Sequence, residues 1–174
     1  YAGGIVGSHL VGASIRSCYA TGNISGRYSG GIVGQARNVE RCVALGQTVT
    51  GASSHRVLSE PNGKLNVYAW RSMKVNGNTV TDGAANNENG ADLVYNGGAL
   101  SKQFSEIFAN DDAWTYTENG LPILKVVKGE QSSELPSWML RSETTIYITT
   151  AQQLKQLADE VNAGDSKSGK TYLL

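Results

Sequence analysis

Short apolar runs separated by glycine dominate the first half of the chain. Residues 4–7, 15–20 and 30–34 each hold two or three Val, Ile or Tyr residues and then reach a glycine within a few positions. Such runs are too short for helices, and their β-branched and aromatic content favours short strands. One unit of this kind cannot bury its own apolar side, so we expect several units to stack.

The runs recur after 27 residues in one half of the unit and after 24 in the other. Gly3-Gly4-Ile5-Val6-Gly7 returns 27 residues later as Gly30-Gly31-Ile32-Val33-Gly34. Residues 15–26 return at 39–51 with Cys18 and Cys42 in the same place, and a degraded third copy covers 65–77. The residues that define the repeat are Gly3, Gly4, Gly7, Cys18, Gly22, Gly30, Gly31, Gly34, Cys42 and Gly46.

Stacked units of this length predict a mainly β protein, a right-handed parallel β-helix. The hand follows from the preference for right-handed crossovers between parallel strands. Equivalent residues then form ladders at about 4.8 Å, the spacing between neighbouring strands. The expected ladders are Ile5 on Ile32, Cys18 on Cys42 and Val67, and Ala20 on Ala44 and Ala69. A leucine-rich repeat has a similar period, but its leucine ladder is missing.

The middle of the chain changes character. Residues 76–98 are rich in Asn, Gly, Asp and Ala and predict a loop or a hairpin insertion. Leu100, Phe104, Ile107 and Phe108 follow at helical spacing with Ser101 as N-cap, and we expect this helix to cover the open end of the stack. Residues 114–127 predict a hairpin that turns at 118–120.

The C-terminal part predicts a strand, a helix and a second strand. Thr150 and Gln153 have capping-box spacing, apolar residues 151–161 share one helical face, and Gly164 marks the end of the helix. We interpret residues 1–128 as a solenoid with its cap, 129–142 as a linker, and 143–174 as the start of a following repeat domain.

Composition and charge narrow the function classes. Charged residues make up 17% of the chain and the formal net charge is +0, which does not favour nucleic acid. Residues 1–58 hold five single arginines against one acid, Glu40, a net charge of +4, and we expect these side chains to be solvated on repeat loops. No apolar run is long enough to insert into a membrane. The chain opens within a motif, so we interpret it as a processed or excised piece.

Two cysteines occupy equivalent repeat positions. The functional interpretation is a disulfide or a metal pair, because neighbouring rungs bring the Cα atoms within disulfide range. The alternative is an apolar ladder of small side chains, which we favour because the third copy places Val67 in this position. A zinc site needs more ligands than the chain clusters, so no metal site is predicted.

No catalytic constellation is visible, and we predict neither catalytic nor cofactor-binding residues. His9 and His55 lie in expected loops without a nucleophile motif. A β-helix enzyme acting on polysaccharides would need several acids on neighbouring rungs, whereas the two clear repeats contain only Glu40. Calcium stays open as an alternative at Asn86, Glu88 and Asp92, although turn chemistry is the favoured explanation.

The combination of G-G-I-V-G with [I/V]-x-x-C-x-A-x-G resembles the GLUG repeat of bacterial surface proteins. Residues 3–7, 15–26, 30–34 and 39–51 carry the resemblance, over about the first half of the chain. It implies a secreted or surface-anchored parent, such as an adhesin or an IgA-cleaving metallopeptidase, in which repeats flank the functional parts. The third copy lacks the Gly-Gly element and places Trp70 where Thr21 and Leu45 stand, as expected at the end of a solenoid.

The resulting hypothesis is a non-catalytic, structural or adhesive module on the bacterial surface or outside the cell. Its partners would be the neighbouring domains of the parent chain and a host-surface protein or glycan. The first alternative is a carbohydrate-binding module that stacks sugars on Trp70, Trp114 or Trp138, provided that a ring is exposed. The second is an accessory repeat segment of a secreted peptidase.

Overall fold

The computed structural model describes residues 1–8, 14–61, 63, 65–95, 100–118, 120–140, 145–164 and 170–174. The chain divides into two compact units, residues 1–134 and residues 135–174. The division falls inside the range predicted as a linker. Each unit is described by itself below.

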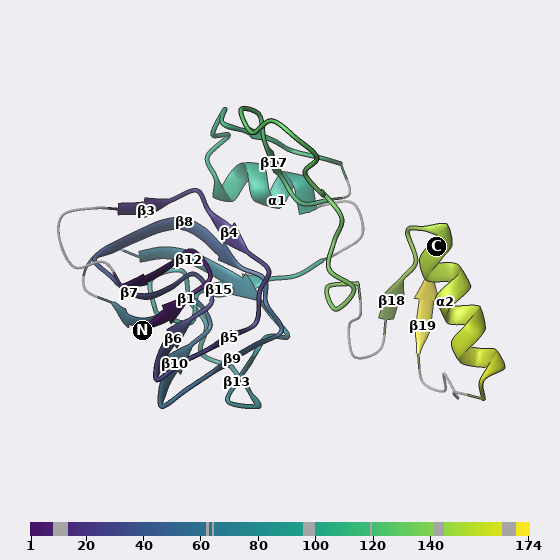
Figure 1. The fold of residues 1–174 in the computed structure, drawn as a ribbon, viewed down its shortest axis with the longest axis horizontal. Coiled ribbons are helices and arrows are strands. Elements are labelled where there is room, and N and C mark those ends of the chain that lie inside the picture. Colours follow the sequence, from purple (N-terminus) through teal and green to yellow (C-terminus); the bar gives the residue numbers. More distant parts are fainter. Residues whose placement is uncertain are drawn as a thin grey trace. The chain divides into compact units, whose positions relative to one another are not determined.

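The first unit is a parallel β-solenoid of about three turns (Figure 1). Rung 1 contains the strands β1 (Ala2–Gly3), β2 (Val6–Ser8), β3 (Ser14–Arg16), β4 (Tyr19–Ala20) and β5 (Ile24–Ser25). Rung 2 contains β6 (Tyr28–Gly30), β7 (Val33–Ala36), β8 (Asn38–Ala44) and β9 (Thr48–Thr50). Rung 3 contains β10 (Ser53–His55), β11 (Leu58–Pro61), β12 (Leu65–Trp70) and β13 (Lys74–Val75).

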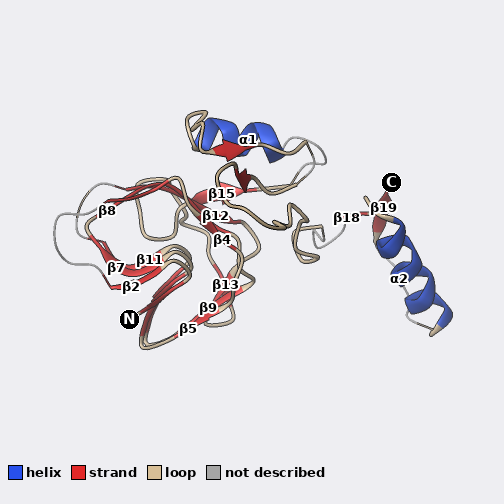
Figure 2. Cartoon of the chain, turned by 45° about the horizontal axis from the view of Figure 1, so that its top comes forward, coloured by secondary structure: helices blue, strands red, loops and turns tan. Residues whose placement is uncertain are grey.

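Equivalent strands pair in parallel, so that each rung lies on the next along the stack (Figure 2). The sheet orders are β1-β6-β10, β2-β7-β11, and β3 or β4 with β8, β12 and β15 (Ala91–Leu93). The fourth sheet runs β5-β9-β13 and ends in the antiparallel β14 (Asn78–Thr79). The predicted parallel solenoid is confirmed, while its hand stays a prediction.

The predicted ladders form in register. Val6 pairs with Val33, and the Ile5 and Val6 amides both donate to the Ile32 carbonyl. Ala20 pairs with Ala44, which pairs in turn with Ala69. Val67 pairs with Cys42. Rung 2 is covered on both sides, and its apolar residues form the core at 0% exposure, namely Ile32, Val33, Val39, Cys42, Val43, Ala44, Leu45 and Val49.

A left-handed residue bends the long sheet in the same way in two rungs. Ser17 and Arg41, which directly precede the two cysteines, have φ angles of 49° and 57°. In rung 1 this residue separates β3 from β4, whereas in rung 2 it lies within β8, and in both rungs the chain continues along the same sheet. Rung 3 omits this residue, and the pairing of β12 with β8 shifts register between Asn66 and Val67. The third copy is therefore one residue shorter at this bend.

A helix and a hairpin cover the outer face of the long sheet. Helix α1 (Leu100–Ile107) buries Leu100, Phe104 and Ile107, and β16 (Trp114–Thr115) pairs antiparallel with β17 (Ile123–Leu124). Tyr19, on the outside of β4, contacts Phe104 at 5.8 Å between ring centroids.

Two expectations for this cap were wrong. It covers the side of the stack rather than its open end, because the aromatic face of α1 meets the outward Tyr19. Ser101 lies inside the helix and does not cap it, since α1 begins at Leu100. The hairpin is confirmed, although Asn119 in its predicted turn lies outside the described residues.

The second unit has the predicted strand, helix and strand. Parallel strands β18 (Thr145–Tyr147) and β19 (Thr171–Leu173) are connected through α2 (Ala151–Asn162). The capping box of Thr150 and Gln153 is present, and Gly164 takes a φ of 89° just after the helix. Within the described ranges, no helix has the length and apolarity that crossing a membrane requires.

Candidate functional site

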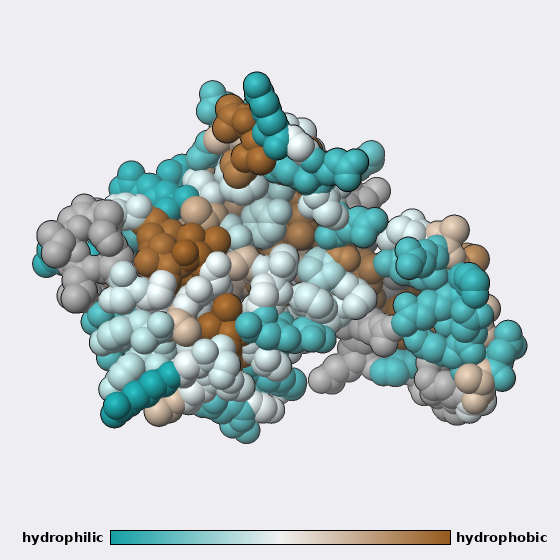
Figure 3. Space-filling model, viewed as in Figure 1, coloured by the Kyte–Doolittle hydropathy of each residue, from teal (hydrophilic) through white to brown (hydrophobic). Residues whose placement is uncertain are grey.

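The two ends of the solenoid differ, and this difference is its main functional feature. At rung 1, the edge that faces away from rung 2 leaves the apolar side chain of Ile5 46% exposed. Ile32, the rung 2 equivalent of Ile5, is 0% exposed. Figure 3 shows apolar surface on the face where Figure 1 draws the strands of rung 1. Rung 1 therefore exposes positions that are buried where another rung covers them.

The repeat glycines allow close approach of successive rungs. A Cβ on Gly31 would lie 2.7 Å from the Ala44 Cβ and would overlap the Arg56 carbonyl of rung 3. A Cβ on Gly34 would lie 2.8 Å from the Tyr1 Cβ, against the Gly7 carbonyl. Glycine is required here because a neighbouring rung occupies the space, and not because of an unusual φ. Gly3, Gly4 and Gly30 are similarly blocked by the next rung.

The open edge of rung 1 carries the same glycines without the neighbour. A Cβ on Gly46 would overlap the Gly22 carbonyl, whereas a Cβ on Gly22 would have no atom within 4 Å. Gly7 stands in the same relation to Gly34, and a Cβ there would meet only Tyr1 atoms at 3.3 Å or beyond. Rung 1 thus has the residues that stacking requires on a side where the described chain supplies no rung.

The other end of the stack is closed by Arg56. His55 pairs with Gly30, so Arg56 occupies the place of Gly31 in a third copy that has no Gly-Gly element. The side chain is 0% exposed, against the expectation that the arginines of the repeats are solvated. In rung 3 no further rung restricts this position, and the space that a fourth rung would fill holds a guanidinium.

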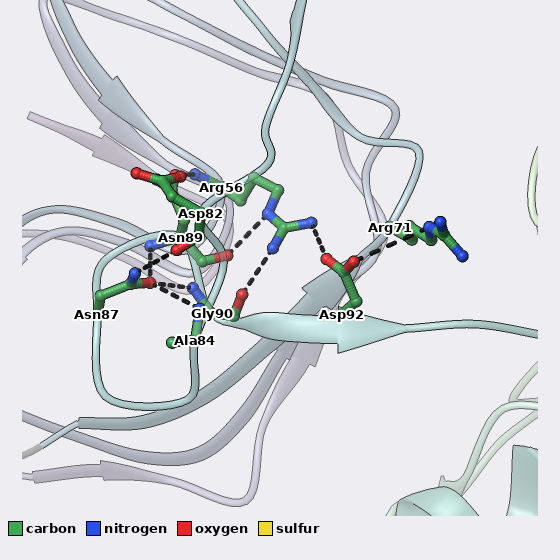
Figure 4. A network of polar contacts seen from close by, with 8 residues as sticks. All are labelled: Arg56, Arg71, Asp82, Ala84, Asn87, Asn89, Gly90 and Asp92. Atoms are coloured by element: carbon green, nitrogen blue, oxygen red, sulfur yellow. Dashed lines mark hydrogen bonds and ion pairs between the residues drawn. The ribbon is translucent and has the colours of Figure 1, made fainter.

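The Arg56 guanidinium binds the segment between β14 and β15, which covers rung 3 (Figure 4). Its Nε donates to the Asn89 carbonyl at 2.8 Å, Nη2 to the Gly90 carbonyl at 2.6 Å, and Nη1 to Asp92 Oδ1 at 2.7 Å. Arg71 approaches the other oxygen of Asp92 at 3.9 Å. All three Arg56 contacts are charge-assisted, which makes them stronger than neutral hydrogen bonds.

Asparagines hold the same segment in shape. Asn87 Oδ1 accepts from the amides of Ala84, Asn89 and Gly90 at 3.0–3.1 Å. Glu88 continues the backbone pattern of the rungs, because the Val57 and Leu58 amides both donate to its carbonyl, as Ile5 and Val6 do to Ile32. The segment therefore completes the backbone bonding of rung 3. It was predicted only as a loop or hairpin insertion.

The cysteine pair lies inside the stack at rungs 1 and 2. Cys42 is 0% exposed, while Cys18 is half-buried, and both thiols are free. The Cys42 thiol donates to the Cys18 thiolate and, against the effect of burial, lowers the pKa of Cys18 to about 7. The same interaction and burial raise the pKa of Cys42.

Of the three tryptophans, Trp70 and Trp114 serve packing in the surroundings that the structure describes. Trp70 is 4% exposed, so no face of its ring is free for a sugar, and the stacking role predicted for it does not fit this burial. Trp114 is half-buried between Tyr19 and Phe108, and its indole N–H donates to the Ser17 carbonyl at 3.1 Å. Trp138, in the second unit, is half-buried and has an interaction partner.

The remaining chemical candidates are engaged in structural contacts or lie outside the described residues. His55 Nε2 lies 3.6 Å from Glu88 Oε1, and Asp92 pairs with Arg56, so two of the three groups considered for calcium belong to the closed end. Among the described residues, no three His, Cys, Asp or Glu side chains gather in a way that could hold a metal ion. His9 lies outside these residues.

A family model for the GLUG motif matches residues 1–25, which correspond to rung 1. The chain contains a GLUG motif. Rung 2 repeats its residues in register, so the motif corresponds to one turn of the solenoid. The GLUG motif indicates a repeat module of a larger protein. No curated protein and no solved structure matches the chain.

Proposed function

We propose that this GLUG solenoid is a non-catalytic surface module that joins and spaces the domains of a larger extracellular or cell-surface protein. The observation that carries the proposal is the asymmetry of the stack. Rung 1 exposes an apolar edge with unused glycine positions, while rung 3 is closed by Arg56. A stack that is open at one end extends by adding rungs there, and this is how solenoids reach their length.

The side chains that the repeat shares support a structural role. Ser29 and Ser54 bond to each other at 2.8 Å inside the stack, in register along the same sheet. Tyr1 stacks on Tyr28 with ring centroids 5.1 Å apart on the exposed side. Each of these pairs joins one rung to the next. Their repetition is explained by stacking without a bound ligand or a substrate.

Adding a rung tests the proposal directly. A copy of residues 28–52 fused through its C-terminus to Tyr1 supplies a complete rung in the register of Ala2 with Ser29. We expect the extended protein to gain β-structure and to unfold at higher urea concentration, because the exposed edge near Ile5 is then buried. The matched control carries the same copy with its equivalents of Val39 and Val43 changed to Asp, which prevents stacking.

An unchanged or lower midpoint in the extended protein, equal to that of the control, would contradict stacking at rung 1. An adhesive role is tested separately by screening the folded chain against glycan and host-matrix arrays, with tryptophan fluorescence recorded in parallel. A specific ligand that changes the fluorescence would make the module a recognition domain and would point to Trp114 or Trp138. A negative result with folded protein agrees with a spacer.

A further inference from the structure

The cysteine pair combines three features that a plain packing ladder does not need. One thiol is buried and the other half-buried, the pKa of the Cys18 thiol is lowered by its neighbour Cys42, and a residue with positive φ precedes each cysteine. We propose that Cys18 and Cys42 form a disulfide that joins rung 1 to rung 2 when the folded protein meets a small-molecule disulfide. This modification does not depend on the proposed surface location.

The backbone places the two residues opposite each other. Tyr19 pairs with Val43, and the Val43 amide donates to the Cys18 carbonyl at 2.9 Å. Residues opposite each other on neighbouring strands are separated by about 4.8 Å. This separation lies inside the Cα–Cα range of disulfides, about 4.4–6.8 Å. The stack therefore needs no backbone shift to bring the pair within range.

The positions of the two sulfur atoms also favour the pair. The left-handed residue before each cysteine turns the thiol back on its own strand, so that Cys18 Sγ lies 3.0 Å from the Arg16 carbonyl oxygen and Cys42 Sγ lies 3.3 Å from that of Glu40. Cys42 Sγ also lies 3.6 Å from the Ile15 carbonyl, and thus reaches across to rung 1. The third rung has Val67 here, so the pair has no competing thiol in the stack.

The exposure of the two cysteines decides which thiol reacts first. Only Cys18 can meet a reagent, and its lowered pKa provides thiolate near neutral pH. The Cys18 thiolate attacks one sulfur of the reagent, whose S–S bond breaks and releases one thiolate. Cys42 Sγ then attacks Cys18 Sγ and expels the second thiolate, which takes up the proton of the Cys42 thiol. The protein loses two protons and two electrons, and the reagent is reduced to two thiols.

Oxidised glutathione, as the probe, tests this order on the intact chain. We expect the folded protein to lose the mass of two hydrogens, with residues 18 and 42 linked in the peptide map. Valine is the matched replacement because rung 3 uses Val67 at this position. Cys42→Val should stop at a stable mixed disulfide on Cys18, and Cys18→Val should not react. A glutathione adduct on Cys18 as the final product in the unmodified sequence, or no reaction, would overturn the proposal.

Amide exchange then shows whether the bridge forms within the native stack. The Val43 and Leu45 amides donate to carbonyls of rung 1 and exchange when that rung opens. In the bridged protein, their exchange should slow by about tenfold or more, because the disulfide holds rung 1 on rung 2. Cys42→Val treated with the same reagent should show no slowing. Faster exchange in the bridged protein would mean that the bridge forms only after rung 1 unfolds, against the proposal.

Discussion

Replacing Arg56 with methionine would remove the closure of rung 3 while keeping a long apolar side chain in its place. The change removes three charge-assisted contacts, to the carbonyls of Asn89 and Gly90 and to the Asp92 carboxylate. Methionine fills much of the volume of the arginine stem, so a large cavity is not the main effect. The loss comes chiefly from polar groups that remain without partners.

The magnitude follows from what is left behind. Asn89 and Gly90 are buried, and each buried carbonyl without a donor costs about 1–3 kcal/mol. The Asp92 side chain is 45% exposed, so water can solvate its carboxylate and the charge adds little. We therefore expect the free energy of local opening at rung 3 to fall by about 3 kcal/mol, which is less than the roughly 3–5 kcal/mol for a fully buried ion pair.

The assay is exchange of the Val57 and Leu58 amides, which donate to Glu88 at 3.1 Å and 3.3 Å. Their exchange should accelerate by roughly 100-fold in Arg56→Met. Arg71→Met is the matched control, because Arg71 approaches the same carboxylate from 3.9 Å with its side chain 68% exposed, and it should change exchange only slightly. Equal effects of the two variants, or none from Arg56→Met, would refute the closure of rung 3 by Arg56.

Three further changes test other parts of the structure. Gly31→Ala should destabilise the first unit by about 2 kcal/mol or more in urea unfolding, whereas Gly22→Ala should stay within about 0.5 kcal/mol, because only Gly31 faces a filled neighbour. Trp114→Phe leaves the Ser17 carbonyl without its indole donor and should lower stability by about 1 kcal/mol, seen as a lower thermal midpoint. Thr150→Ala removes the capping box and should lower the helicity of α2 by circular dichroism, at a cost of about 1 kcal/mol.

The outcomes that contradict these expectations are specific. Equal destabilisation by Gly31→Ala and Gly22→Ala would mean that the glycines act through chain flexibility and not through rung spacing. A Trp114→Phe protein as stable as the original would show that the indole N–H serves no purpose in holding the cap. An unchanged helix signal in Thr150→Ala would show that other contacts order α2 without its cap.

The sequence predicted the pairing between rungs correctly where the same residue type recurs in the repeat. Ile5 with Ile32 and Ala20 with Ala44 and Ala69 were paired correctly from spacing alone, because stacking places equivalent residues opposite each other. The capping box of Thr150 was likewise readable, since its donors and acceptors are local in the chain. Repetition and local chemistry are therefore the parts of this fold that a single sequence specifies.

The two ends of the solenoid were harder to predict because each occurs once. Arg56 replaces a glycine and binds residues more than 30 positions away, and the repeat pattern does not predict such a contact.

Features outside the repeat were also predicted only in part. The apolar spacing of Leu100 and Phe104 indicated that one side of α1 is buried, but the surface that it packs against includes Tyr19 of rung 1, which the spacing does not identify. Trp70 was proposed as a stacking platform because composition cannot distinguish an exposed indole from a buried one.

Amide exchange across the whole chain is the most direct test of a solenoid that is open at rung 1 and closed at rung 3. The structure predicts the slowest exchange in β7 and β8 of rung 2, which lie between neighbours on both sides. Strands β10 to β12 should follow, protected by the segment that Arg56 holds, and the strands of rung 1 should exchange fastest within the solenoid. Protection in rung 1 that equals or exceeds that in rung 2 would contradict an open stacking edge and the function proposed from it.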